Sequence, residues 1–306
     1  MLMPLPGNYH DTDITGLIVS KVFPFSDTHL ADITVGKLDV LDTATGFFPG
    51  LAYGQEGFWN VNSSISALPW FGAVAGLSLY GGYGMTINKE HGIPQSGFLI
   101  TGTENVTTTN GQLADSFDDG VWLAAFHSFL WKMDDKPGYF MIFGGYSTRD
   151  QVSNEPHDFF FKPGQGIEND DEEKPWDIAL YFTQDLWHAE GNPNRKVVFL
   201  MGGTAGPDNP QFAQYNFFAN VEGFGLIPSR PHDRMGMAGW WNGFSDNFTD
   251  LISPVADFQD LYGFELYYNY QINKWMHLSP DIQLVQNEWK DDDMAVIFGV
   301  RLVIDL

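Results

Sequence analysis

The sequence predicts an all-β protein, a single transmembrane antiparallel β-barrel of the outer-membrane type spanning residues 1–306. Apolar and polar residues alternate over long segments, short and long connections alternate between those segments, and aromatic residues make up 16% of the chain. Period-two alternation indicates strands with one apolar and one polar face. Membrane-crossing strands have about 9–11 residues, against about 5–6 in soluble sheets. Strand length therefore favours a barrel over its alternative, a soluble β-sandwich.

The C-terminal part of the chain shows this pattern most clearly, in residues 261–272, 276–284 and 294–306. In the last of these segments the alternate apolar positions are Met294, Val296, Phe298, Val300, Leu302, Ile304 and Leu306. Aromatic residues lie near the ends of the predicted strands, where interfacial girdles are expected. These residues are Tyr262, Tyr270, Trp275 and Trp289.

Ten further strands are predicted toward the N-terminus, which makes thirteen in all. They lie near residues 12–22, 29–38, 70–84, 95–103, 120–132, 137–147, 177–187, 195–204, 213–224 and 234–245. Short connections are expected at 23–28, 133–136, 188–194 and 272–274, and longer ones at 39–69, 104–119, 148–176 and 246–260. Because such barrels have short periplasmic turns and long outer loops, the C-terminus is expected on the periplasmic side.

An odd number of strands is itself informative, because bacterial single-chain barrels have an even number. We therefore expect that N-terminal strands and a signal peptide are missing, since residues 1–7 have neither a basic nor an apolar region. The alternative is that one strand is miscounted. Residues 294–306 should close the barrel, so this segment must pair with 12–22 or remain an edge.

Composition and motifs argue against several other classes of protein. The chain has 39 acidic and 15 basic residues, which argues against a nucleic-acid partner. It has no run of 18 apolar residues, no cysteine, and neither HExxH nor Gly-x-Ser-x-Gly. We expect no enzyme, no cofactor and no metal. A pair of catalytic carboxylates is not excluded by residue type, but no pair stands out.

Three groups of segments carry a resemblance to a known family: 263–269, 275–285 and 296–306; 35–42 with 58–60; and 225–236. In combination they resemble the carbohydrate-selective porin (OprB) family. The resemblance implies a passive sugar porin in the outer membrane of a Gram-negative bacterium, with about sixteen strands. It also implies outer-membrane lipid and the barrel assembly machinery, through the C-terminal strand, as partners, and leaves a homo-oligomer open. One departure is Leu306, where such barrels commonly end in Phe.

The segment 39–69 is the expected constriction of the pore, because the family folds loops inward. It combines aromatic rings, which stack on sugars, with polar groups, which bind hydroxyls. The expected site residues are Asp39, Asp42, Phe47, Tyr53, Gln55, Glu56, Trp59, Asn60 and Asn62. The alternative is an ordinary outer loop on the rim of the barrel.

Alternation also predicts which polar side chains line the lumen, because ionisable groups at membrane depth must face a wet cavity or be paired. The predicted set is Asn216, Asn220, Glu222, Glu265, Asn269, His277, Asp281, Gln283 and Arg301. We expect most of them to form a bracing polar wall and a minority to contact the solute. Arg230 and Arg234 are interpreted as structural residues of a periplasmic turn, rather than as a selectivity ring.

The predicted function is passive diffusion of small solutes, preferably sugars, through a water-filled lumen. The alternatives are a general pore, a shortened barrel without function, and a barrel enzyme or soluble carbohydrate-binding β-protein. An acidic wall would disfavour anions as solutes.

Overall fold

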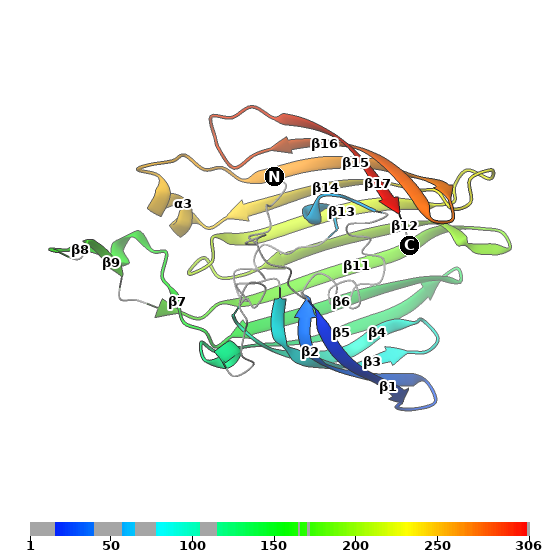
Figure 1. The fold of residues 1–306 in the computed structure, drawn as a ribbon, viewed down its shortest axis with the longest axis horizontal. Helices are drawn as coiled ribbons and strands as arrows, with labels where there is room; N and C mark the ends of the chain where they lie inside the picture. Colours follow the sequence, from blue (N-terminus) through cyan, green and yellow to red (C-terminus); the bar gives the residue numbers. More distant parts are fainter. Residues whose placement is uncertain are drawn as a thin grey trace.

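The computed structural model describes residues 16–39, 57–64, 78–104, 115–164, 166–169 and 172–304. Thirteen strands of this part form one antiparallel sheet, in which consecutive strands lie side by side (Figure 1). In sheet order they are β1 (Leu17–Pro24), β2 (His29–Asp39), β3 (Ser78–Asn88), β4 (Ile93–Gly102), β5 (Val121–Met133), β6 (Lys136–Ser147), β11 (Trp176–Ala189), β12 (Asn192–Ala205), β13 (Ala213–Phe224), β14 (Arg234–Phe244), β15 (Leu261–Asn273), β16 (Met276–Gln286) and β17 (Ala295–Ile304). The predicted fold class and the thirteen strands are confirmed.

Most of the observed strand ends lie within a few residues of the prediction, and β3 is the exception. It was expected at 70–84, and its described part runs from Ser78 to Asn88, four residues past the predicted end. The strand ends there because Lys89 to Gly92 form the turn, with Gly92 at a φ of 66°. Residues 70–77 and 12–15 of the predicted strands lie outside the described residues.

The connections alternate in length as predicted. β5 and β6 are joined by only Asp134 and Asp135, whose φ angles are 49° and 62°. Two successive residues with positive φ form the kind of two-residue turn whose twist matches that of the two flanking strands. At the other end of the strands, the connections between β4 and β5, between β6 and β11, and between β14 and β15 are longer.

Short elements lie outside the main sheet. They are η1 (Val61–Ser63), η2 (Asp115–Phe117), η3 (Pro156–Asp158), β7 (Gln151–Val152), β8 (Phe159–Lys162), β9 (Gly166–Asn169), β10 (Glu172–Glu173) and α3 (Asp246–Ile252). β7 to β10 pair in two small two-stranded sheets within the long loop between β6 and β11. Among the described helices, none has the length and apolar character needed to cross a bilayer.

The sheet has two unpaired edges in the described part of the chain. β1 pairs only with β2, and β17 pairs only with β16. Of the two outcomes expected for the last strand, pairing with the first strand is therefore not observed within these residues.

The two faces of the sheet differ sharply in exposure. Along β5, the side chains of Trp122, Ala124 and Phe126 are buried, whereas Leu123 and Phe129 are 41% and 52% exposed. The outward positions of β17 are apolar and exposed: Val296, Phe298, Val300, Leu302 and Ile304. An exposed apolar face with a buried opposite face is the arrangement of a barrel wall in lipid.

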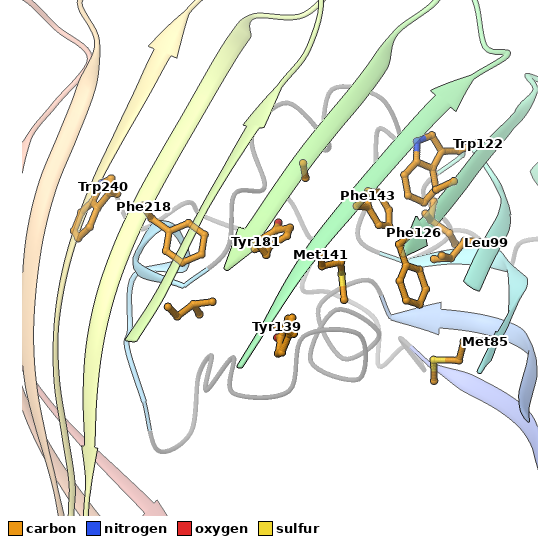
Figure 2. Close-up of a cluster of buried hydrophobic side chains, with 14 of the residues drawn as sticks. Met85, Leu99, Trp122, Phe126, Tyr139, Met141, Phe143, Tyr181, Phe218 and Trp240 are labelled. Atoms are coloured by element: carbon orange, nitrogen blue, oxygen red, sulfur yellow. The ribbon is translucent and has the colours of Figure 1, made fainter. Parts of the chain in front are cut away.

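The inner face carries a band of buried apolar side chains across β3 to β14. Figure 2 shows that these side chains project from the same side of neighbouring strands. Its largest members are Met85, Leu99, Trp122, Phe126, Tyr139, Met141, Phe143, Tyr181, Phe218 and Trp240. The apolar band is densest on these strands, which also carry buried polar side chains such as Asp177 and Gln184, and a second group of buried polar residues lies on β13 to β16.

Candidate functional site

The structure places the predicted lumen-lining residues together on the inner face of β13 to β17. Asn216, Asn220, Glu222, Glu265, Asn269, His277, Asp281 and Gln283 are all at most 5% exposed, and Arg301 is half-buried. They contact one another and a short segment inside the sheet, residues 57–64, which we call the inner segment. The polar half of the wall is thus a connected network.

Glu222 and Arg234 form a buried ion pair in this network. Arg234 Nη2 donates to Glu222 Oε2 over 2.7 Å and to Oε1 over 2.9 Å, and Nε donates to Oε1 over 3.1 Å. The Tyr267 hydroxyl donates to the same Oε1 over 2.5 Å, and the guanidinium lies 4.5 Å from the centre of the Phe224 ring. Arg234 was predicted to lie in a turn; it begins β14 and braces the inner wall.

The inner segment contains three of the predicted constriction residues. Trp59 is partly buried, while Asn60 and Asn62 are each 5% exposed. The side chain of Asn60 accepts a hydrogen bond from the N–H of Asn62, which starts the helical turn η1. Asp39 ends β2. The other predicted constriction residues, Asp42, Phe47, Tyr53, Gln55 and Glu56, lie outside the described residues.

Glu265 of β15 is the main polar contact of the inner segment. Its Oε1 accepts from the backbone N–H of Trp59 over 2.5 Å, and its Oε2 accepts from the N–H of Asn60 over 3.1 Å. The Ser63 hydroxyl donates a further, very short hydrogen bond to Oε2. A fully buried carboxyl group thus has three donors from one segment that lies about 200 residues away in the sequence.

Three other wall residues bind the inner segment directly. Arg301 of β17 donates from Nη2 to the Gly57 carbonyl over 2.8 Å, and its guanidinium lies 5.0 Å from the centre of the Trp59 ring. The Asn220 amide donates to the Ser63 carbonyl over 2.8 Å, and the Asn60 amide donates to Gln283 Oε1 over 3.3 Å. Side chains from β13, β15, β16 and β17 therefore hold eight residues.

The wall leaves room for the aromatic rings of the inner segment. Phe58 is fully buried, and its ring meets that of Tyr267 edge to face, with centroids 4.8 Å apart. A Cβ at Gly236 would come within 2.8 Å of the Phe58 ring, and one at Gly299 within 2.5 Å of the Trp59 ring. Glycine is needed at these two wall positions for the rings to lie this close.

Further hydrogen bonds brace the wall toward both ends of its strands. The Asn269 amide donates to Ser279 Oγ over 2.9 Å, and its carbonyl oxygen lies 2.9 Å from His277 Nδ1. Asn216 and Asn242 share a short side-chain hydrogen bond between β13 and β14. These contacts fit the expected bracing role of the polar wall.

Arg230 and Asp233 form a second ion pair, in the turn between β13 and β14. Arg230 donates to both carboxylate oxygens of Asp233, over 2.7 and 2.8 Å, and stacks on Tyr270 at 3.8 Å. Burial raises the pKa of Asp233, but hydrogen bonds from Arg230, Tyr268 and the Gln271 N–H outweigh it, so the pKa lies below its ordinary value. These contacts lie within the turn and join it to the neighbouring strand β15, as in the structural role predicted for Arg230.

Several important residues of this region were not predicted as site residues. Phe58, Ser63 and Tyr267 complete the contact between the inner segment and the wall. Tyr267 stands at the alternate position between Glu265 and Asn269, so period two alone could have identified it. Phe218 lies in the same way between Asn216 and Asn220. Nothing in the local sequence around Ser63 indicates a partner on a distant strand.

One group in the described residues has the composition of a metal site. Glu155, His157 and Asp158, in and beside η3, each place a ligand atom within 4.8 Å of the other two. His157 is 76% exposed and forms ion pairs with both carboxylates, at 3.1 and 3.2 Å. The group lies in the long loop between β6 and β11, and the inner wall has no comparable group among the described residues.

Known proteins resemble this chain both in sequence profile and in fold. Residues 32–306 match the sequence profile of the family described as "Carbohydrate-selective porin, OprB family". No curated protein sequence matches at a significant level. The high-pH structure of Pseudomonas putida OprB has a TM-score of 0.71 at 14% identity, over 95% of this chain and 73% of that chain. The low-pH structure of the same protein has a TM-score of 0.47 at 12% identity, over 90% and 62%.

The structural likeness shows the fold, and the profile match extends over nearly the whole chain. The family is a class of channels rather than of enzymes. This chain belongs to the carbohydrate-selective porin (OprB) family.

Proposed function

We propose that this chain lets small sugars diffuse passively across the outer membrane of a Gram-negative bacterium, along the inner face of its sheet. The observation that carries the proposal is the contrast between the two faces. The outward face is apolar and exposed, while the inward face joins a polar network on β13 to β17 with an aromatic band on β3 to β14. Family membership supports sugars as the permeating solutes.

The chemistry of the inner face suits a sugar better than an ion. Sugars present hydroxyl groups, which need donors and acceptors, and C–H faces, which pack on aromatic rings. The inner segment and the wall beside it offer both, with the partly buried Trp59 ring next to the half-buried Arg301 guanidinium. We infer that residues 39–69 narrow the path, and the position of residues 57–64 against the inner wall supports this.

Two further partners follow from the same proposal. The outward side chains of β17 would contact lipid, and this strand would be the one presented to the barrel assembly machinery. A homo-oligomer would use part of the same apolar face, so lipid and a second copy compete for it. Cross-linking in native membranes tests the oligomer directly.

Liposome swelling tests the proposed function. Vesicles containing the folded protein are placed in isosmotic solutions of a pentose, a hexose, a disaccharide or a trisaccharide. Neutral amino acids of matched mass are tested separately for comparison. We expect swelling that is faster for sugars than for amino acids and slower with increasing sugar size. A folded protein that swells no vesicles, or does not distinguish sugars from amino acids, would contradict the proposal.

A matched pair of tryptophan variants tests whether the inner segment causes the preference for sugars over amino acids. Trp59→Ala removes an aromatic ring from the inner segment, whereas Trp241→Ala removes one from the outward face, where Trp241 is 39% exposed. We expect only the first variant to lose the preference for sugars over amino acids. Equal effects of both variants would show that the inner ring has no special role.

A further inference from the structure

We propose that Glu265 is the positioning residue of the pore: its carboxyl group holds the inner segment against the wall and thereby sets the width of the path. The proposal rests on the proposed porin function and adds a specific anchor to it. Glu265 itself would not need to contact the sugar, because it is completely buried behind the segment that it holds.

Three hydrogen bonds run from the inner segment to the carboxyl group of Glu265. Both Glu265 oxygens accept from the inner segment, from two backbone N–H groups and the Ser63 hydroxyl. A buried carboxyl group that loses its donors carries the full cost of desolvation. The contact is therefore stabilising for both sides: the segment supplies the donors, and without the segment Glu265 would be left buried and without them.

Glu265 lies between the other polar contacts of the wall with the inner segment. Arg301 binds Gly57 at the start of the inner segment, and Asn220 binds the Ser63 carbonyl near its end. Glu265 is the one described side chain that binds three residues of the segment, Trp59, Asn60 and Ser63. Each of the other polar wall side chains contacts only one or two residues of the segment.

The wall has space for the aromatic rings of the inner segment. Gly236 and Gly299 leave space for the Phe58 and Trp59 rings, and Tyr267 packs edge to face on Phe58. Packing of this kind fixes the depth of the segment, while the carboxyl group fixes its register along the strand. The ring packing and the carboxyl group together hold the inner segment in one fixed position in the lumen.

Thiol labelling tests the position of the segment without relying on conduction. Ser64, which is 1% exposed, is replaced by Cys in this chain without native cysteines, and a charged methanethiosulfonate reagent is added to the folded protein. In the Glu265→Ala background we expect labelling at least about tenfold faster, a shift of about 1.4 kcal/mol. Glu265→Gln, which keeps the volume and one acceptor oxygen, should lie between it and the wild type.

The matched control is Asp32→Ala, which also removes a buried carboxyl group from the inner wall. Asp32 accepts hydrogen bonds from Ser20 and Thr34 and makes no contact with the inner segment in the described structure. We expect this variant to label at the wild-type rate. Heat-modifiable migration on a gel identifies variants that fail to fold, in which case Glu265→Gln carries the test.

Planar-bilayer conductance of the same variants tests the second half of the proposal. We expect Glu265→Ala to have a larger and noisier single-channel conductance than Asp32→Ala and the wild type. Wild-type labelling rates in both Glu265 variants would overturn the anchor, whatever the conductance. Faster labelling with unchanged conductance would overturn its role in setting the width. A wild-type protein that makes no pore would refute the proposed function, while the labelling result still decides the anchor.

Discussion

The buried pair of Glu222 and Arg234 allows the sharpest prediction of stability. The two side chains are 5% and 13% exposed, and three N–H···O contacts and the Tyr267 hydroxyl join them. Removing one partner of a buried pair costs about 3–5 kcal/mol, because the other is left buried without compensation. We expect Arg234→Met to lower the free energy of unfolding by about that amount. Tyr267→Phe, which removes one hydrogen bond to a charged group, should cost about 1.5–3 kcal/mol.

Urea titration of the protein folded into lipid vesicles measures these values, with the fluorescence of the ten tryptophans as the signal. The double variant Glu222→Met with Arg234→Met should cost clearly less than the sum of the two single variants, since neither charge remains unpaired. A cost below about 1 kcal/mol for Arg234→Met, or additive single costs, would show that the pair is already solvated and that the reasoning is wrong.

Three further predictions use the same unfolding assay. Leu180→Arg places a charge on the outward face, where Leu180 is 44% exposed. It should lower the free energy of unfolding by about 2–4 kcal/mol more than Leu180→Ala does. Equal losses in the two variants would mean that this face is not in lipid. Because the pKa of folded Asp233 is lowered, its contribution is complete above the unfolded pKa of about 4 and is lost as the pH falls through the folded value. Asp233→Asn should therefore lose stability at pH 7 and progressively less as the pH falls below about 4, and a pH-independent loss would exclude this linkage. Asp135→Gly relieves a left-handed backbone in the turn after β5 and should raise the free energy of unfolding by about 0.5–1 kcal/mol, whereas a decrease would argue for a role of the Asp side chain.

The strands and their faces could be predicted from sequence because both depend on local period-two alternation. A shift of one residue would turn every apolar side chain of a strand to the wrong face. β14 to β17 accordingly lie within two residues of their predicted positions. The far end of β3 was predicted four residues too early, at 84, although Met85 and Ile87 continue the alternation toward Asn88.

The nature of the inner face was predicted only in part. Alternation correctly indicated that Glu222, Glu265 and Asp281 share a face with one another, but it does not say what else that face carries. The aromatic band with Phe218 and Trp240 on the inner side was not predicted, because a large apolar residue at an inward position looks the same in sequence as one facing lipid.

The sequence alone was enough to determine the all-β class, the strand count, the polar inner face of β13 and β15 to β17 and the family resemblance, because each depends on residues that are close together in the chain. Only the tertiary structure decided that Trp59 and Ser63 meet Glu265, that Arg301 holds Gly57, and that β1 and β17 are unpaired edges in the described chain. The reason is physical. A hydrogen bond between residues 206 positions apart depends on how thirteen strands bring their inner faces together, and no local pattern records that arrangement.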